Sequence, residues 1–128
     1  MEKVNSVLII DDEPFMNMIN EKIMQKADFA PHIDKFEDAG RALDDLKKNY
    51  NERQEFPDCI FVDVNMPGMD GWAFLDELKK FPLEVLHKCK VFMLSASINK
   101  SDIEKCKPYR FVADFIIKPL SVDKLKAL

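Results

Sequence analysis

The stretch "CIFVDVNMPGMDGW", residues 59–72, places an acid directly after a run of apolar residues. A continuous apolar run as short as residues 59–62 is typical of a parallel strand that is covered on both faces. Asp63 ends this run, and Pro67 and Gly68 follow within five positions, as in a turn. A carboxylate is costly to bury, so the rest of the chain must explain why an apolar strand ends on one.

Strand-like and helix-like segments alternate along the whole chain. Further strands are predicted at residues 7–10, 31–36, 90–97 and 113–119. Helices are predicted at residues 14–27, 38–50, 71–81, 99–111 and 121–128. This alternation indicates one α/β domain, residues 1–128, with a parallel sheet and right-handed crossovers.

Local signals shape several of these helices. Pro14 suits the first turn of the first helix, and Ser121 is the expected N-cap of the last one. Pro108 is expected to break the fourth helix. Helical spacing of apolar residues predicts that the core-facing stripe of the first helix consists of Phe15, Met18, Ile19, Ile23 and Ala27.

The composition is that of an ordinary soluble protein, with 47% hydrophobic and 33% charged residues. The net charge of −4 gives no support for nucleic-acid binding. Cys59, Cys89 and Cys106 form no C-x-x-C pair and have no His at a zinc spacing, so we expect reduced thiols in a cytoplasmic protein. No signal peptide is visible, and no segment approaches the ~20 apolar residues that a membrane helix needs.

Polar residues follow four of the predicted strands. Asp11 and Asp12 follow the first strand, Asp63 the third, Ser95 the fourth and Lys118 the fifth. In an open parallel sheet these ends lie on one edge, where such folds bind ligands. Each residue alone is more often a helix cap or a surface group. Their joint occurrence at four strand ends favours one shared site.

Three carboxylates at one edge repel one another unless a cation lies among them. Oxygen ligands without His or Cys suit Mg²⁺, with Mn²⁺ as an alternative, and Mg²⁺ leaves room for phosphate oxygens. The ammonium of Lys118 adds positive charge, so this edge can cradle a phosphoryl group. A carboxylate can also accept that group as a nucleophile. Asp63, alone at a strand end, is the best candidate, and Asp11 and Asp12 suit a metal-holding pair.

The segments "LIIDDE", "IFVDVNMPGMDGW", "MLSAS" and "DFIIKP", in this order, resemble a response regulator receiver domain. This family is the CheY-like phosphoacceptor module of two-component signalling, and the resemblance covers essentially the whole chain. It implies a flavodoxin-like, CheY-like fold, which is a doubly wound sheet of five parallel strands in the order 2-1-3-4-5 with helices on both faces.

The resemblance also implies a role for each residue of the acidic edge. Asp63 corresponds to the phosphorylated aspartate of the family. Asp11 and Asp12 correspond to the acidic pair that holds Mg²⁺ together with Asp63. Asn65 corresponds to the position whose backbone carbonyl binds the metal.

Three further residues match the parts of the family that sense the phosphoryl group. Ser95 corresponds to the hydroxyl residue that meets a phosphoryl oxygen, and Lys118 to the lysine that pairs with that group. A cis bond between Lys118 and Pro119 is implied. Phe115 corresponds to the switch aromatic, which turns inward when Ser95 moves. Asn65 and Ser97 are expected to influence how long the phosphoryl group persists.

Three other functions fit the sequence less well. A phosphatase of the haloacid dehalogenase type needs D-x-D on its first strand, whereas "DDE" stands here. A nucleotide-binding protein needs a glycine-rich motif, which Gly40, Gly68 and Gly71 do not form. A pseudo-receiver would lack site residues, and all five are present.

The expected partners follow from the resemblance. A sensor histidine kinase or a histidine phosphotransfer protein would donate the phosphoryl group, and an unidentified output protein would read the switch. The domain would not be an enzyme beyond its own phosphorylation and dephosphorylation. We expect no binding to nucleic acid or membranes, and a phosphorylation-dependent homodimer remains open. Neither His32 nor His87 is expected at the acidic edge.

Overall fold

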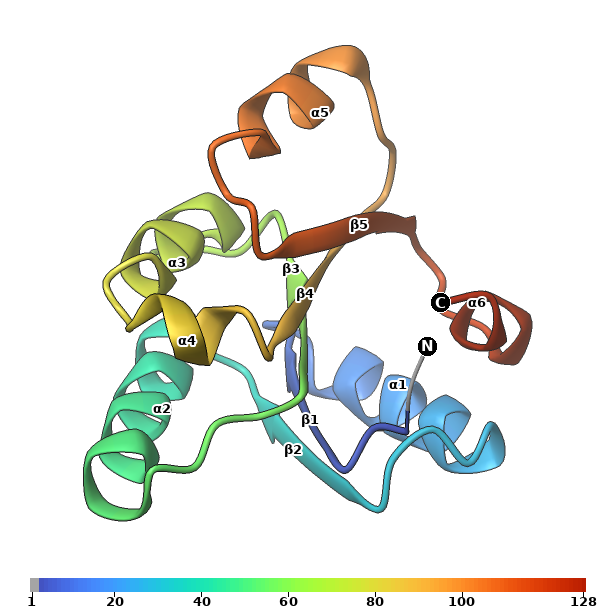
Figure 1. Ribbon diagram of the computed structural model, residues 1–128. Helices are drawn as coiled ribbons and strands as arrows, with labels where there is room; N and C mark the ends of the chain where they lie inside the picture. Colours follow the sequence, from blue (N-terminus) through green and yellow to red (C-terminus); the bar gives the residue numbers. More distant parts are fainter. Residues whose placement is uncertain (1–2) are drawn as a thin grey trace.

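Five parallel strands form one sheet in the order β2-β1-β3-β4-β5 (Figure 1). The computed structural model describes residues 3–128. The strands are β1 (Ser6–Ile10), β2 (His32–Phe36), β3 (Cys59–Asp63), β4 (Lys90–Ser95) and β5 (Val112–Ile117). The predicted fold class, including the strand order, is therefore confirmed.

Helices cover both faces of this sheet. They are α1 (Pro14–Lys26), α2 (Ala39–Arg53), α3 (Gly71–Leu78), α4 (Leu83–Leu86), α5 (Lys100–Cys106) and α6 (Val122–Lys126). Figure 1 shows α1 and α6 on one face, α2, α3 and α4 on the other, and α5 beside the β5 edge. Among residues 3–128, no helix combines the length and apolar character that are required to cross a membrane.

The central strand β3 is buried along its whole length. Its alternate residues enter two separate cores, because successive side chains of a strand point to opposite faces. Ile60 and Val62 pack in the core beneath α2 and α3, and Cys59 and Phe61 pack in the core beneath α1 and α6. A strand that is covered on both faces needs apolar residues at every position, which explains the continuous apolar run before Asp63.

The three cysteines differ in how deeply they are buried. Cys59 and Cys89 are buried and Cys106 on α5 is partly exposed, all three as free thiols. Burial raises the pKa of Cys59 to about 11. Burial also raises the pKa of the Cys89 thiol far above its ordinary value. Neither buried thiol therefore ionises near neutral pH.

Several predicted helix ends are confirmed. Helix α1 begins at Pro14, and the Ser121 hydroxyl caps α6 by accepting the Lys124 N–H at 3.1 Å. Helix α5 ends at Cys106, before Pro108. The third helix was expected to continue to residue 81 but ends at Leu78.

The short helix α4 was not predicted. A proline disfavours helical backbone in the residue before it, so Pro82 separates the third helix from the residues that follow. Pro82 then acts as the N-cap of α4, and Leu86 of this helix is buried against the core.

The predicted core stripe of α1 is partly wrong. Phe15 is 65% exposed and Met18 is 39% exposed. The helix instead turns Asn17, Asn20 and Met24 toward the sheet. The partly buried pair Ile23 and Ala27 does pack against the core, as expected.

Asn17 accounts for this rotation of α1. Its side-chain amide donates hydrogen bonds to the carbonyl oxygens of Asp11 at 2.9 Å and Phe36 at 3.0 Å. These carbonyls lie at the ends of two neighbouring strands, and the Phe36 carbonyl also accepts the Asp11 N–H at 3.1 Å. Oδ1 of Asn17 is buried and accepts no hydrogen bond from residues 3–128. The two hydrogen bonds of the amide nitrogen therefore explain why Asn17 points inward.

Gly71 allows the loop after β3 to lie directly against the start of α3. Its N–H donates to the Val64 carbonyl at 3.0 Å. A Cβ at this position would lie 2.8 Å from the Asp63 carbonyl oxygen and 2.9 Å from the Val64 Cα. Both of these atoms are backbone, so no side chain can turn away to make room.

Gly71→Ala is therefore expected to lower the free energy of unfolding by about 1–3 kcal/mol, because overpacking displaces backbone. Urea unfolding measures this loss. The matched control is Gly40→Ala, whose added Cβ would meet only the carboxylate end of Asp38, at 3.0 Å. Equal stability of the two variants would contradict the close approach at Gly71.

Candidate functional site

The carboxyl ends of the strands bring the predicted acids together. Asp11 and Asp12 follow β1, and Asp63 is the last residue of β3. One carboxylate oxygen from each of these three residues lies within 4.8 Å of the others. Asp11 and Asp63 are buried and Asp12 is partly exposed. The cluster is therefore open to solvent on the side of Asp12.

Lys118, which follows β5, lies against two of these acids. Its ammonium nitrogen is 2.6 Å from Oδ2 of Asp63 and 3.5 Å from Oδ2 of Asp11. Burial would by itself lower the pKa of Lys118. The hydrogen bond to Asp63 and the charges of Asp11 and Asp63 outweigh burial and raise this pKa above its ordinary value. Lys118 is therefore a fixed positive charge at this edge at neutral pH.

Asp11 is the acid that is least well compensated. Burial raises the pKa of Asp11, and the charges of Asp63 and Asp12 raise it further. The hydrogen bond from the Glu13 N–H to Oδ1, at 3.0 Å, and the charge of Lys118 oppose this rise without cancelling it. Oδ2 of Asp11 is buried and accepts no hydrogen bond from the residues described. A ligand that supplies positive charge at Oδ2 would thus be stabilised.

The donor set fits a hard divalent cation. All the side-chain donors of the cluster are carboxylate oxygens, which Mg²⁺ and Mn²⁺ accept. Asn65 lies next to the cluster and donates its N–H to Oδ1 of Asp63 at 3.1 Å. His32 opens β2 and His87 follows α4, so both lie at the other ends of the strands, away from the acids. The geometry matches the expectation that no imidazole takes part.

Ser95 completes this edge from β4. Its hydroxyl is almost fully buried and donates a hydrogen bond to the Ser97 carbonyl at 2.6 Å. The Ser95 carbonyl accepts the Lys118 N–H at 2.8 Å. This hydrogen bond joins the ends of β4 and β5 next to the Ser95 hydroxyl and the Lys118 side chain.

An aromatic cluster adjoins Phe115, which lies on β5, two strands away from Asp63 on β3. Phe115 is partly buried, and its ring centroid lies 6.0 Å from that of Trp72, at the start of α3. Trp72 also contacts Tyr109, at 6.4 Å, and the ammonium of Lys105 lies 4.9 Å from the Trp72 ring. The Tyr109 hydroxyl donates to Asp76 at 2.5 Å. These contacts join α3 to the segment between α5 and β5.

Three neighbours of the site were not predicted from the sequence, Asn17, Trp72 and Tyr109. A polar residue inside an apolar helix pattern was the available signal for Asn17. The run "YRF" at residues 109–111, after Pro108, signalled a packed turn. Nothing in the sequence indicated that this turn would contact α3.

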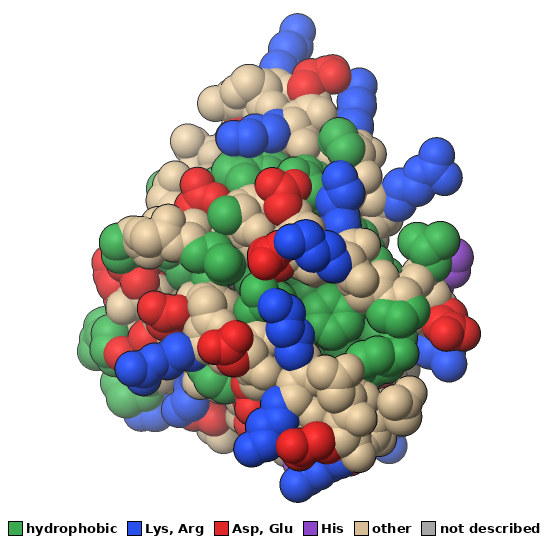
Figure 2. All heavy atoms as spheres, turned by 90° about the vertical axis from the view of Figure 1, so that its left-hand side faces the viewer, with side chains coloured by type: hydrophobic (Ala, Val, Ile, Leu, Met, Phe, Trp, Pro, Cys, Tyr) green, Lys and Arg blue, Asp and Glu red, His purple; other side chains and the backbone are tan. Residues whose placement is uncertain are grey.

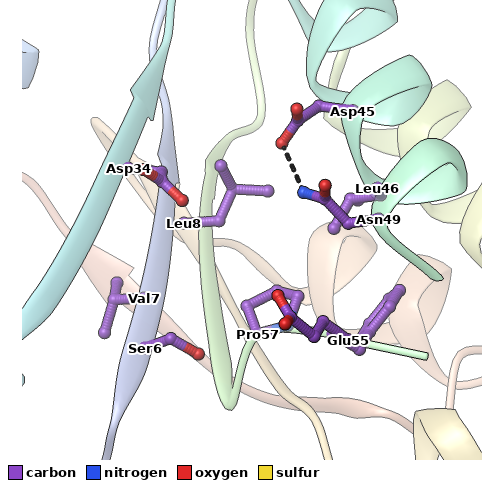
Figure 3. Close-up of a pocket in the computed structure, with 10 residues that line it drawn as sticks. Ser6, Val7, Leu8, Asp34, Asp45, Leu46, Asn49, Glu55 and Pro57 are labelled. Carbon is purple, nitrogen blue, oxygen red and sulfur yellow. Dashed lines mark hydrogen bonds between the residues drawn. The ribbon is translucent and has the colours of Figure 1, made fainter. Parts of the chain in front are cut away.

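A small cavity of about 100 Å³ lies at the opposite edge of the sheet. Figure 3 shows Asp34, Asp45 and Asn49 around it, with Asn49 donating to Asp45 at 3.1 Å. Ser6, at the amino end of β1, and Pro57, which precedes β3, also line it. This cavity does not adjoin the acidic cluster and is not part of the candidate site.

The face formed by α2, α3 and α4 is chemically mixed. Figure 2 shows lysine and arginine side chains interspersed with acids and apolar groups on this face. A continuous basic patch, which nucleic-acid binding would use, is not visible on it.

Comparison with known proteins agrees with the geometry. The family model described as "Response regulator receiver domain" matches residues 7–128. The chain is 29% identical over 119 residues to the chemotaxis protein CheY of Bacillus subtilis, with 93% of this chain and 89% of that protein covered. It is 34% identical over 120 residues to the two-component response regulator ARR2 of Arabidopsis thaliana, with 94% of this chain covered.

Solved structures show the same fold. A two component response regulator from Cytophaga hutchinsonii has a TM-score of 0.88 and 29% identity, over 98% of this chain and 94% of that one. A chain of the CheX–CheY–BeF3–Mg²⁺ complex from Borrelia burgdorferi has a TM-score of 0.78 and 27% identity, over 96% of this chain and 84% of that one. The present chain spans only 16% of ARR2, and 50% of a probable C4-dicarboxylate response regulator DctR of Halalkalibacterium halodurans.

Asp11→Asn is expected to stabilise the metal-free domain by on the order of 1 kcal/mol. The raised pKa of Asp11 means that the folded state disfavours its charged form, so wild-type stability falls as pH rises through the folded-state pKa. The variant should lose this fall. Urea unfolding as a function of pH, without divalent metal, measures both effects.

The same variant is expected to lose its stabilisation by metal. Mg²⁺ at 100 times its dissociation constant should stabilise the wild type by about 2.7 kcal/mol, and Asp11→Asn should abolish most of this gain. An Asp11→Asn domain that is less stable without metal, or equally stabilised by Mg²⁺, would contradict the description of Asp11 as an uncompensated ligand.

The hydrogen bond to Asp76 raises the pKa of Tyr109 to about 12, from an ordinary value of 10.0. Its contribution to stability is therefore present below pH 10.0 and is lost as pH rises through about 12. Asp76→Asn is expected to return the pKa of Tyr109 toward its ordinary value. Absorbance titration in a Tyr50→Phe background follows Tyr109 alone, because the chain contains two tyrosines. An unchanged titration would exclude the contact with Asp76.

Proposed function

The chain belongs to the response regulator receiver domain family, and from this membership we propose that it is a switch in which Asp63 accepts a phosphoryl group. Receiver domains are signalling phosphoacceptors of two-component systems, and phosphorylation switches them. The proposal places this function at named residues of the present chain. The observation that carries it is the cluster of three carboxylates with the Lys118 ammonium 2.6 Å from Asp63.

The transfer itself exchanges one bond to phosphorus for another. A phosphohistidine of the donor protein loses its N–P bond as an Asp63 oxygen forms an O–P bond, and the imidazole nitrogen keeps the electron pair. This step requires mainly positioning and neutralisation of charge. Lys118 is already beside Asp63 and would pair with a phosphoryl oxygen. Mg²⁺, held by Asp11, Asp12, Asp63 and the Asn65 carbonyl, would supply further positive charge when bound.

The switch would begin at Ser95. A phosphoryl group on Asp63 adds about two negative charges and three strong hydrogen-bond acceptors. The Ser95 hydroxyl, which now donates to the Ser97 carbonyl, would turn toward one of these acceptors. Phe115 is only partly buried and would move into the space that Ser95 leaves. The surface formed by α5, β5 and α6 would change with it.

The partners follow from the same proposal. Response regulators interact with histidine kinases and output proteins, so the donor would be a histidine kinase or a histidine phosphotransfer protein. A similar chain was solved as part of a complex with CheX, BeF3 and Mg²⁺, which supports BeF3 and Mg²⁺ as probes of this site. Residues 1–128 would act as one receiver domain in the cytoplasm, and an output protein would read its phosphorylated state.

Incubation of the domain with acetyl phosphate and Mg²⁺ is expected to give one labile phosphoryl adduct. Asp63→Asn should abolish the adduct, because an amide cannot accept the phosphoryl group. Intact mass spectrometry measures the adduct. The matched control is Asp44→Asn, which makes the same chemical change on the exposed face of α2.

Two further conditions sharpen this test. Removal of Mg²⁺ by a chelator should lower the yield of adduct at least tenfold, on the order of 1.4 kcal/mol. The emission of Trp72, the one tryptophan of the chain, should change with phosphorylation because its ring contacts Phe115. An adduct that persists in Asp63→Asn would place the phosphoacceptor elsewhere and refute the proposal.

A further inference from the structure

The side chain of Lys124 folds back from α6 onto the backbone that carries Lys118. Its ammonium donates hydrogen bonds to the carbonyl oxygens of Ile117 at 2.6 Å and Pro119 at 2.8 Å. These two carbonyls lie on either side of Lys118 in the chain. A single cation therefore holds the residues before and after the lysine of the proposed phosphoacceptor site.

Lys124 lies near both ends of α6, which has five residues. Ser121 is the N-cap, and Lys124 is the third residue of the helix that follows it. This position often holds Glu or Gln, which can return a hydrogen bond to the N-cap N–H. Lys124 also belongs to the last turn, where cations are favoured. The lysine ammonium finds its hydrogen-bond partners outside the helix, in the carbonyls of Ile117 and Pro119.

Apart from Lys124, two contacts hold the backbone around Lys118. Strand β5 ends at Ile117, and the last backbone contact with β4 is the Lys118 N–H, which donates to the Ser95 carbonyl at 2.8 Å. Leu120 is buried in the core beneath α1 and α6, whereas Ile117 is 47% exposed and Pro119 is at the surface. Without the Lys124 ammonium, water would satisfy both carbonyls, and the backbone on either side of Lys118 would lose its contact with the Lys124 side chain.

A shift of this turn would change the distances from the Lys118 ammonium to Asp63 and Asp11. The Lys118 ammonium reaches Asp63 at 2.6 Å and Asp11 at 3.5 Å from a backbone that lies outside the sheet. A charged group must be held close to the productive geometry to stabilise a transferring group, since misplacement by about 1 Å can cost about 100-fold. The position of the Lys118 ammonium therefore depends on the position of the turn between β5 and α6.

We propose that Lys124 is a positioning residue that aims Lys118 at the phosphoryl group through the carbonyls of Ile117 and Pro119. It touches neither the phosphoryl group nor any residue of the acidic cluster. This inference rests on the proposed function, because it assigns Lys124 to the same site. Loss of Lys124 then weakens phosphoryl binding while leaving the metal ligands as they were.

The test compares two affinities in the Lys124→Met domain. Beryllium fluoride at saturating Mg²⁺ reports the phosphoryl position, and Mg²⁺ alone reports the carboxylates, both through the emission of Trp72. The variant is expected to bind beryllium fluoride about tenfold more weakly, with Mg²⁺ affinity unchanged within about twofold. A general loss of folding would instead weaken both ligands together, and thermal unfolding of each variant measures that loss separately.

Two matched variants accompany it. Lys124→Arg keeps several donors on one long side chain and should restore most of the affinity. Lys126→Met removes the same charge from the same helix, and its side chain makes no hydrogen bond or ion pair within residues 3–128, so it should leave both affinities unchanged. Amide exchange of the Lys118 N–H in the unliganded domain should accelerate in Lys124→Met and not in Lys126→Met, which reports the turn without any ligand.

The outcomes separate the inference from the proposed function. If the wild type binds beryllium fluoride and Lys124→Met binds it equally well, the positioning role is wrong and the phosphoacceptor site stands. Equal loss of Mg²⁺ and beryllium fluoride affinity would also reject it, in favour of a purely structural lysine. A wild type that binds no beryllium fluoride would overturn the proposed function, and the role of Lys124 would fall with it.

Discussion

The burial of carboxylate charge at one sheet edge is the constraint on which this structure depends. Asp11 is buried and has an oxygen that accepts no hydrogen bond from residues 3–128, and Asp63 and Asp12 lie close to it. The Lys118 ammonium compensates part of the cost of this burial, and the rest is left for a bound cation. A protein that kept such a site only for stability would gain by replacing it, because buried charge that is incompletely compensated is destabilising. The cost is reasonable only for a site that binds something, and the family to which the chain belongs binds Mg²⁺ and a phosphoryl group at its acidic cluster.

The surrounding fold keeps these charges where they are. Strand β3 is buried at every position, so Asp63 follows directly from the packed core of the sheet. On one side, Asn17 satisfies the strand-end carbonyls next to the acids, and Gly71 lets α3 begin directly beside Asp63. On the other side, Lys124 holds the turn that carries Lys118. Each of these residues contacts the backbone of the site and not its ligand. Such contacts limit the movement of site residues that lie on loops.

The sequence alone predicted the sheet and the convergence of the acids, because short apolar runs that end in polar residues are local signals. It did not predict the rotation of α1, since the hydrogen bonds of Asn17 to two strand ends depend on how the strands are arranged. The short helix α4 was missed, because its four residues are too few to show a helical pattern. The contacts of Tyr109 with α3 and of Lys124 with the β5–α6 turn join segments whose proximity no local pattern encodes. The chemical roles of Asp63, Ser95, Lys118 and Phe115 remain predictions that the proposed experiments address.

The unequal burial of the three cysteines has a practical consequence. Cys59 and Cys89 lie inside the molecule and hold their protons well above neutral pH, whereas Cys106 on α5 is only partly buried, although burial raises the pKa of its thiol as well. Thiolates, not thiols, react with alkylating reagents, so a maleimide dye will attach to the native chain at Cys106 first. That attachment point lies on the element next to β5, within the surface that phosphorylation would reshape. The native sequence thus offers one preferred site for a fluorescent label, and no cysteine has to be removed beforehand.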